Sequence, residues 1–427
     1  MKKKILSILL CSVFTVGLLT GCGAKDKKNS EAKENVELTM TMWGSEEDQK
    51  IYQERLDAAK ELYPEISVNL VYIPKEYNQK LQTMIAGNTA PDIMELSDEI
   101  HVYSSKNQLV PLNDYLNKDG INLEERFGTT YEQYTRDGKT YALPDRGGNM
   151  LVYYNKDLFD AAGVKYPTAD WTWDDMLNAA QKLTIKEGDK VKQYGFAAGA
   201  WWPWWMSFMY QNGGKILDDN GKPIVNSKEN IEALQFYNDL VYKYKVAPSP
   251  SDFANLGDVK PDQLFAQGKA AFVITGFWNV NSLSKVEALN WDIAPLWKNK
   301  VSATASFGSG LAISSKSKHP EEAYKVIEYL TSEKGQMPIV TNKEDAPANL
   351  QVLNSDEFSK AEWSKNPINI QACKDSAEMA FNTPLSEHWN EMLKVFEDGL
   401  AEYFNGTEQS AEKVLNNIQV QLEEMFK

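Results

Sequence analysis

Cysteine and histidine are scarce in this chain, which has three of each among 427 residues. Cys11 and Cys22 lie within and at the end of an apolar N-terminal run, which leaves Cys373 as the one cysteine of the body. After N-terminal processing, an intramolecular disulfide framework is therefore excluded. No cysteine–histidine spacing matches a zinc signature, so we expect no metal and no cofactor.

Basic charge is also in short supply, with 45 Lys plus Arg against 60 Asp plus Glu and a formal net charge of −15. This balance argues against nucleic acid as a partner, because no basic field is available to displace phosphate counterions. The sequence also lacks the GxxxxGK[ST], HExxH and GxSxG motifs. Residues 145–148 (DRGG) are not a phosphate loop, because no Lys-Ser/Thr pair follows them.

The N-terminus combines Lys2-Lys3-Lys4 with an apolar run over residues 5–19, which is shorter than the roughly 20 residues of a membrane-spanning helix. The run ends in Leu19-Thr20-Gly21-Cys22, which is similar to a bacterial lipobox. We predict a lipoprotein signal peptide over 1–21, a lipidated Cys22 and a flexible tether over 22–35. Lipidation predicts attachment to the outer face of the bacterial cell membrane. The alternatives are an ordinary signal peptide or a coincidental cysteine.

The folded body alternates strand and helix patterns, which predicts an α/β fold with a parallel sheet. Strands are expected over 37–42, 66–73 and 93–96, with helices starting at Ser45 and over 77–86. Ligands of such sheets lie at the carboxyl ends of strands. The candidates at these ends are Trp43, Ser45, Glu46, Asp98 and Glu99.

Four of the 12 tryptophans fall within residues 201–205, interrupted by Pro203. Proline is tolerated in the first turn of a helix, so we predict a helix from Pro203 to Asn212 with Trp205 on its buried face. Trp201 and Trp202 would then lie in the preceding loop. Indole faces beside unpaired backbone donors suit a sugar ring, although packing in the core is an equal alternative for both.

Several stretches, taken in order, resemble the family 1 extracellular solute-binding proteins, the carbohydrate receptors of ATP-driven importers. They are WG at 43–44, APDI at 90–93, YALP at 141–144, YNKDLF at 154–159, WP at 202–203, the run 265–278 and the run 317–335. Their order and spacing extend over nearly the whole mature chain, which makes the resemblance specific.

The resemblance implies two α/β lobes joined by crossing segments, with a sugar held in the cleft between them. The first lobe would comprise 36–144 and 301–341, and the second 149–295 and 351–427. Hinge crossings are expected at 145–148, 296–300 and 342–350, where the chain is rich in Gly, Pro or polar residues. We expect a monomer.

The resemblance also implies roles for individual residues. Trp43, Ser45 and Glu46 would line the first-lobe wall, and Asp98 and Glu99 would hold sugar hydroxyls. The chain departs from maltodextrin-binding members of the family, since Leu96 replaces an aromatic platform and Ile100 replaces an arginine. This departure weakens the case for maltodextrin as the ligand.

In the second lobe, Trp202, Trp278 and Trp389 fall on aromatic positions of the family, and Trp201 is a further candidate. Helix packing is nearly as good an account of Trp389. Arg146, at the first crossing, would donate to a sugar hydroxyl or an acid, with a surface ion pair as the equal alternative.

The resemblance therefore implies the substrate-binding lipoprotein of an ABC importer, which captures a neutral sugar or oligosaccharide and delivers it to the permease subunits. It implies a binding protein and not an enzyme. A secreted glycosidase, which needs two carboxyl groups across the scissile bond, is one alternative. A surface adhesin or sensor without a transporter is another. The residues leave the identity of the sugar open.

Overall fold

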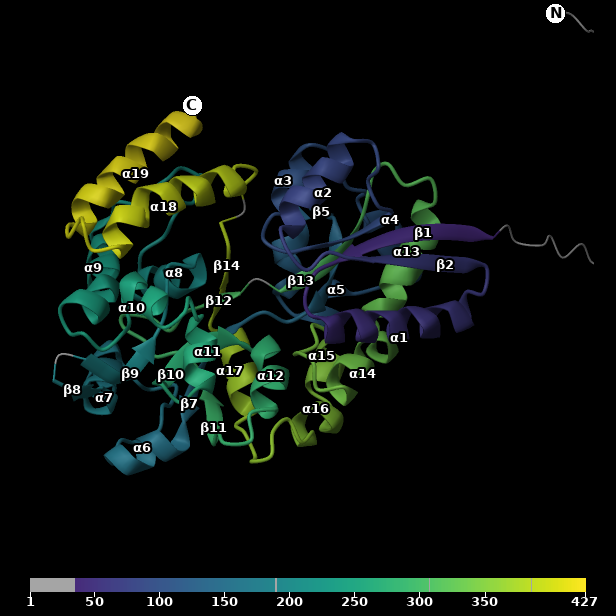
Figure 1. Ribbon diagram of the computed structural model, residues 1–427. Helices are drawn as coiled ribbons and strands as arrows, with labels where there is room; N and C mark the ends of the chain where they lie inside the picture. Colours follow the sequence, from purple (N-terminus) through teal and green to yellow (C-terminus); the bar gives the residue numbers. More distant parts are fainter. Residues whose placement is uncertain (1–34, 189, 307, 385) are drawn as a thin grey trace, which may run out of the picture. The chain divides into compact units, whose positions relative to one another are not determined.

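The computed structural model describes residues 35–188, 190–306, 308–384 and 386–427 (Figure 1). The predicted signal peptide and Cys22 lie outside the described residues. Among the residues that are described, no helix is long and apolar enough to cross a membrane.

The first five-stranded sheet has the order β2-β1-β3-β13-β6. Its strands are β1 (Val36–Met42), β2 (Ile66–Tyr72), β3 (Ile93–Leu96), β6 (Ala142–Arg146) and β13 (Ser309–Ile313). β1 runs parallel to β2 and β3, whereas β13 is antiparallel to β3 and β6. This sheet and the helices packed on it form what we call the first lobe.

The second sheet has the order β11-β7-β10-β9-β8 and forms the centre of the second lobe. Its strands are β7 (Met150–Asn155), β8 (Ile185–Glu187), β9 (Lys190–Ala197), β10 (Ala270–Gly276) and β11 (Trp291–Ala294). β10 is parallel to β9 but antiparallel to β7. The three strands from which a parallel sheet was expected, β1, β2 and β3, do run parallel, but antiparallel partners make the complete sheet of each lobe mixed. Strands that are not joined by a direct helical crossover, such as β3 and β13, are free to pair antiparallel.

The first two helices of the first lobe begin where the sequence predicts them. Ser45 and Asp48 form the predicted capping box of α1 (Glu46–Leu62), and α2 spans Tyr77–Ala86. α1 packs on α13 (Pro320–Leu330) and α14 (Glu333–Thr341). The shorter elements are α3 (Ile100–Ser105), α4 (Asn113–Asp119), α5 (Leu123–Phe127), η1 (Thr130–Tyr134), β4 (Thr135–Arg136) and β5 (Lys139–Thr140).

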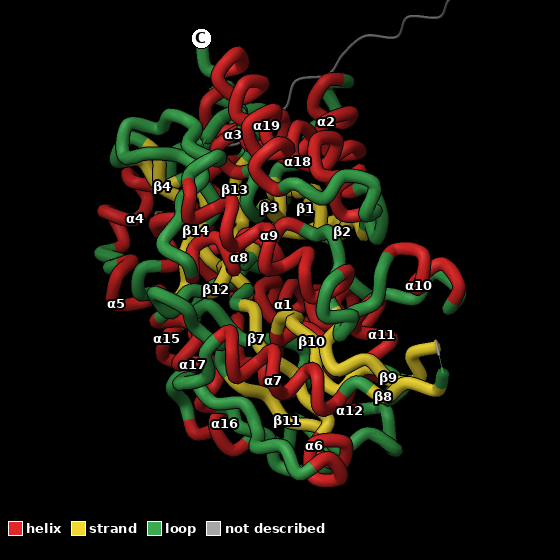
Figure 2. Tube along the Cα trace, turned by 90° about the vertical axis from the view of Figure 1, so that its left-hand side faces the viewer, coloured by secondary structure: helices red, strands yellow, loops and turns green. Residues whose placement is uncertain are grey.

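The helices of the second lobe surround its sheet; Figure 2 shows the helices in red and the strands in yellow. They are α6 (Lys156–Ala162), α7 (Trp173–Leu183), α8 (Trp202–Gln211), α9 (Lys228–Tyr242), α10 (Pro250–Asn255), α11 (Pro261–Ala266), η2 (Phe277–Asn279), α12 (Val280–Ser284), α18 (Trp389–Phe404) and α19 (Ala411–Met425). α9 packs on both α8 and α19, and α19 on α18. The C-terminal helices therefore complete the core of this lobe.

Two crossing segments lie side by side between the lobes. The Gly147 amide donates to the carbonyl of Ala346 over 2.7 Å, and Arg146 pairs with Pro347 in a short antiparallel bridge. A further crossing contains β12 (Thr304–Ser306), which pairs in parallel with β14 (Ala380–Asn382). The Arg146–Pro347 bridge joins residues about 200 positions apart in the sequence, and the β12–β14 pair joins residues about 75 positions apart.

After these crossings the chain continues through α15 (Leu350–Leu353), α16 (Asp356–Lys360) and α17 (Gln371–Glu378). α15 contacts α14 and α5 of the first lobe, although the expected second-lobe segment begins at residue 351. α17 contacts β7 and β11 of the second lobe. The passage from one lobe to the other therefore extends beyond residue 350.

The tryptophan stretch opens α8, which begins at Trp202, one residue earlier than predicted. Trp205 is fully buried, as expected; its indole N–H donates to the carbonyl of Ala200 over 3.2 Å and its ring lies 5.2 Å from that of Phe396. Trp205 thus joins α8 to α18, whereas Trp201, just before the helix, is 41 % exposed.

We predict that Trp205→Ala lowers the free energy of unfolding by about 3–5 kcal/mol, because truncation leaves a cavity between α8 and α18. Trp201→Ala, at an exposed position, should lower it by about 1 kcal/mol or less. Urea denaturation of both variants beside the parent measures the difference. Equal losses of stability for the two variants would contradict this assignment of Trp205 to the core.

Candidate ligand-binding site

A pocket of about 860 Å³ is lined by residues of both lobes and of the crossings between them. The first lobe contributes the ends of β1 and β3, and the second lobe contributes the loop before α8 and the segment after β10. The crossings contribute residues 146–148 and 344–345. The carboxyl ends of β1 and β3 thus meet at this pocket, as the sheet topology requires of parallel strands.

Of the first-lobe candidates, Trp43, Ser45, Asp98 and Glu99 line the pocket, whereas Glu46 is exposed outside its lining. The Trp43 ring packs edge-on against Tyr77, with 5.0 Å between ring centroids. The next two residues of α1, Glu47 and Asp48, are part of the lining.

Asp98 and Glu99 are adjacent carboxyl groups in the same wall. Burial raises the pKa of Glu99 well above its ordinary value, and the neighbouring Asp98 raises it further. Asp98 also accepts a hydrogen bond of 2.8 Å from the indole N–H of Trp389, on α18 of the second lobe. One face of this carboxyl pair is therefore already occupied by a contact between the lobes.

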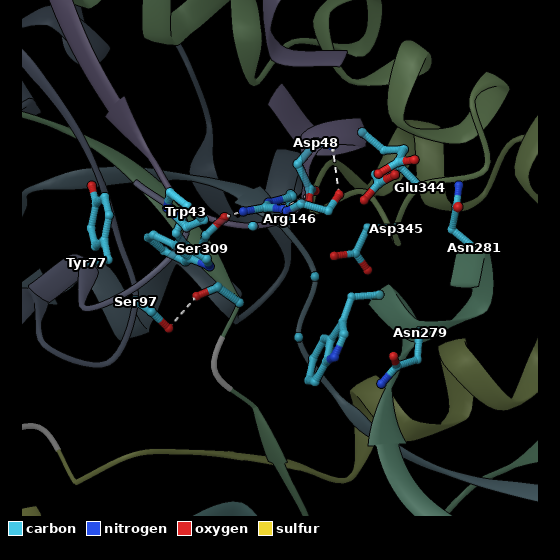
Figure 3. Close-up of a pocket in the computed structure, with 18 of the residues that line it drawn as sticks. Trp43, Asp48, Tyr77, Ser97, Arg146, Asn279, Asn281, Ser309, Glu344 and Asp345 are labelled. Atoms are coloured by element: carbon cyan, nitrogen blue, oxygen red, sulfur yellow. Dashed lines mark hydrogen bonds and ion pairs between the residues drawn. The ribbon is translucent and has the colours of Figure 1, made fainter. Parts of the chain in front are cut away.

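Arg146, the last residue of β6, is buried among carboxyl groups at the pocket wall. Its Nη1 donates to Asp48 Oδ1 over 2.7 Å, and its Nε donates to Glu95 Oε1 over 3.1 Å. The guanidinium also lies 5.7 Å from the centre of the Trp43 ring (Figure 3). These are buried ion pairs, in contrast to the surface pair considered from the sequence, and charge-assisted bonds of this kind hold a side chain in one orientation.

A second buried network contacts Glu95, a carboxyl group that accepts from Arg146. The Tyr52 hydroxyl oxygen lies within hydrogen-bond distance of two carboxyl groups, 2.6 Å from Asp145 Oδ2 and 3.0 Å from Glu95 Oε1. Arg55 binds Asp145 as well, with Nη1 donating to Oδ2 over 3.1 Å. Burial and the adjacent charge of Asp145 together raise the pKa of Tyr52 well above its ordinary value, so this hydroxyl remains a donor.

Glu344 and Asp345 are pocket residues that the sequence reasoning missed. Burial, together with a hydrogen bond to Asp48, raises the pKa of Glu344 to about 9. Burial raises the pKa of Asp345 to about 8, against the opposing effect of Arg146. Burial would raise the pKa of Asp48 too, but Arg146 and the Glu344 hydrogen bond lower it. The hydrogen bond between the two carboxyl groups thus raises the pKa of Glu344 and lowers that of Asp48.

The second-lobe wall presents Trp201 and Trp278, with ring centroids 6.4 Å apart and planes at 68°. Trp278 follows β10 and folds back over Gly276, where an added Cβ would lie 1.9 Å from the indole ring. A glycine is thus required at 276 for the indole to take this position. Asn279 and Asn281 lie on the same side of the pocket (Figure 3).

Trp202 and Trp389 are not brought to the pocket. Their rings pack edge to face at 5.5 Å, and they are 7 % and 0 % exposed. The physical reason is that α8 already begins at Trp202, which directs this side chain onto the start of α18 and not into a loop. The expectation that Trp202 lies in a loop is therefore wrong, and Trp389, which was expected to contact the ligand, packs on Trp202 as the helix-packing alternative describes.

The chemistry of the pocket suits a polar ligand with apolar faces. Indole rings cover C–H surfaces, and carboxylate and amide groups bond to hydroxyls. Within the described ranges, no group of three or more His, Cys, Asp or Glu side chains is arranged to hold a metal ion.

Comparison with known proteins identifies the family. A model of the bacterial extracellular solute-binding proteins matches residues 43–337. The chain belongs to this family. The predicted family and the two-lobe α/β fold are thereby confirmed, as is the prediction of a sugar-binding component of an ABC transporter.

Among solved structures, an ABC substrate-binding protein from Listeria monocytogenes in complex with cycloalternan is 30 % identical, with a TM-score of 0.83 over 91 % of this chain and 98 % of that chain. The arabinooligosaccharide-binding protein of Bacillus subtilis is 26 % identical, over 84 % of each chain. The maltodextrin-binding protein of the same organism is 26 % identical over 99 % of each chain.

We predict that Glu344→Gln flattens the dependence of stability on pH between about pH 5 and about pH 9. The folded-state pKa of Glu344 is raised from 4.5 to about 9, so the native state holds a proton that the unfolded chain releases. Its contribution is fully present below the unfolded pKa and is lost as the pH rises toward the folded pKa.

The melting temperature of the parent should therefore fall more between about pH 5 and about pH 9 than that of Glu344→Gln. Glu61→Gln, an exposed substitution on α1, is the matched control and should follow the parent. Parallel pH profiles for the parent and Glu344→Gln would show that residue 344 does not carry the bound proton.

Proposed function

We propose that this protein captures an oligosaccharide in the pocket between its lobes and delivers it to the permease of an ABC importer. The observation that carries the proposal is a pocket with indole rings on both walls and hydrogen-bonding side chains between them. The volume of about 860 Å³ exceeds what a small ligand needs and lies within the range of about 300–1,000 Å³ typical of ligand pockets.

The relatives support an oligosaccharide in preference to a single sugar. The Listeria relative, at 30 % identity, holds cycloalternan, and the Bacillus relatives are named for arabino-oligosaccharides and maltodextrins. These ligands differ in composition, so they support the class of ligand and do not select one member of it. All of these relatives are binding proteins, which supports binding without turnover.

We further propose that Trp43, Trp201 and Trp278 are the platforms for sugar rings. Each lies at a strand end or before a helix and lines the pocket, in contrast to Trp202 and Trp205. The Trp43 ring packs against Tyr77, and the Trp278 ring occupies the space that a side chain at position 276 would need. The orientation of both rings is therefore fixed before ligand binds.

Truncating one platform should weaken binding by one to two decades. If Trp278→Ala removes roughly 60–100 Å² of apolar contact, the loss is about 1.5–2.5 kcal/mol at about 25 cal/mol per Å². Binding is measured by calorimetric titration with a glycan that raises the melting temperature in a thermal-shift screen. Trp201→Ala should behave alike.

The control is Trp205→Ala, which should melt earlier than the parent yet bind the same glycan with unchanged affinity. Unchanged affinity of Trp201→Ala and Trp278→Ala would contradict the platform assignment. Mass analysis of the glycan after incubation checks for turnover, and hydrolysis abolished by one carboxylate substitution would favour a glycosidase. Failure of every glycan to shift the melting temperature would count against sugar binding itself.

We propose that the protein acts as a monomer tethered to the outer face of the cell membrane through lipidated Cys22. The support is the sequence order of basic residues, a short apolar run, small residues and cysteine. A tether over residues 22–35 would let the binding protein remain near its permease. One acyl chain binds a membrane weakly, so retention requires the several chains of a lipoprotein.

Replacing Cys22 by Ala should move the protein from the membrane fraction to the soluble fraction or leave an uncleaved precursor. Cell fractionation with detection of the N-terminal lipid by mass spectrometry measures the change. Cys373→Ala is the matched control and should stay with the membrane fraction. An unlipidated parent that is as firmly attached as the variant would refute the anchor.

A further inference from the structure

The crossing end of the pocket contains more carboxyl groups than cations. Asp48, Glu95, Glu344 and Asp345 all interact electrostatically with Arg146. The guanidinium is committed to hydrogen bonds with Asp48 and Glu95. Glu344 and Asp345 therefore have no cation of their own at this end of the pocket in the part of the chain that the structure describes.

The excess of carboxyl groups over cations leaves one buried oxygen of Glu344 without a hydrogen-bond partner among the described residues. The Glu344 side chain lines the pocket but is only 6 % exposed, and the buried oxygen is its Oε2. Asp345, beside it in the pocket lining, is 3 % exposed. A buried carboxyl oxygen without a hydrogen-bond partner has lost its hydration without compensation, which costs free energy. A ligand that donates a hydrogen bond to this oxygen would recover that free energy.

Raised pKa values compensate for the lack of a cation beside these two carboxyl groups. Burial raises the pKa of Glu344 to about 9 and that of Asp345 to about 8, so both groups are largely neutral near pH 7. Each faces Asp48 on α1 and Arg146 on β6, and Asp345 also faces Glu95 on β3. Ionisation of either group adds negative charge to a site that holds the carboxylate of Asp48.

We propose that Asp48, Glu344 and Asp345 form a subsite for a positively charged amino group on the saccharide ligand. The inference rests on the proposed function and narrows its ligand to amine-bearing saccharides. An ammonium has three donors and one positive charge, so it satisfies carboxylate oxygens and replaces the bound protons. A hydroxyl of a neutral sugar donates once and brings no charge.

The surroundings of the cluster suit a cation attached to a sugar ring. Asp48, Glu344 and Asp345 lie around Arg146, with the Trp43 ring on its other side (Figure 3). Aromatic faces attract cations as well as the C–H faces of sugars. A free amine would use the carboxyl groups alone, whereas an amino sugar would use both features.

The test compares matched sugars by calorimetric titration at pH 7 and 0.15 M salt. The probes are glucosamine against glucose, galactosamine against galactose, and the β-1,4 glucosamine tetramer against cellotetraose, with putrescine as a free amine. At least one amino sugar should bind about tenfold or more tightly than its hydroxyl partner, and putrescine should bind more weakly than that amino sugar.

Two double variants, each lacking two carboxyl groups, separate the subsite from general attraction to an acidic protein. Glu344→Gln with Asp345→Asn should bring the preference for the amino sugar to about twofold or less. Glu61→Gln with Glu424→Gln replaces the same number of carboxyl groups at exposed positions and should keep the preference. If the first variant fails to fold, Asp345→Asn alone and the proton measurement below test the same point.

Amino-sugar binding should also release protons, which repeated titration in buffers of different ionisation enthalpy measures. Its hydroxyl partner should release none. Absence of binding by every amino sugar, equal affinity within each pair, equal binding of putrescine, or no proton release would overturn the subsite. Tight binding of neutral sugars alone would leave the proposed function standing, whereas no saccharide binding at all would defeat both.

Discussion

The buried charges around Arg146 are the constraint on which the site depends. Arg146 ends β6 and binds Asp48 at the start of α1 and Glu95 on β3, so one side chain connects three elements of the first lobe. Breaking one partner of a buried pair leaves an uncompensated charge and is costly, although replacing the whole network by apolar groups need not be. The network therefore fixes where the pocket wall lies more than it adds stability.

Asp48 shows how one residue connects helix formation to the pocket. Its side chain accepts from the Ser45 amide at 2.6 Å to close the cap of α1, and its other oxygen accepts from Arg146. Glu95 similarly accepts from the Trp43 amide at 3.2 Å. Two carboxylates thus have two roles each: Asp48 caps α1 and binds Arg146, and Glu95 binds Arg146 and the backbone of Trp43. A change in any one of them alters local structure and pocket together.

The sequence predicts local features better than contacts between distant segments. The Ser45 capping box, the bounds of α2 and the burial of Trp205 follow from neighbouring residues, and the structure agrees. The Trp202–Trp389 contact joins positions 187 apart in numbering, and nothing near Trp202 reveals it. Glu344 and Asp345 likewise stand in a predicted crossing, but their pocket role depends on Asp48, on another element.

The position of these carboxyl groups connects ligand binding to the crossings themselves. Gly147 donates to the carbonyl of Ala346, so Arg146 and Asp345 stand on two segments that are hydrogen-bonded next to them. A ligand that changes the charge at Glu344 and Asp345 acts on the same backbone that passes between the lobes. Such a ligand shifts an equilibrium between lobe arrangements only as far as it binds one arrangement better. A ligand that contacts Trp43 on the first lobe and Trp278 on the second binds most tightly when the lobes are close enough for both contacts. This difference in affinity is what would shift the equilibrium toward that arrangement.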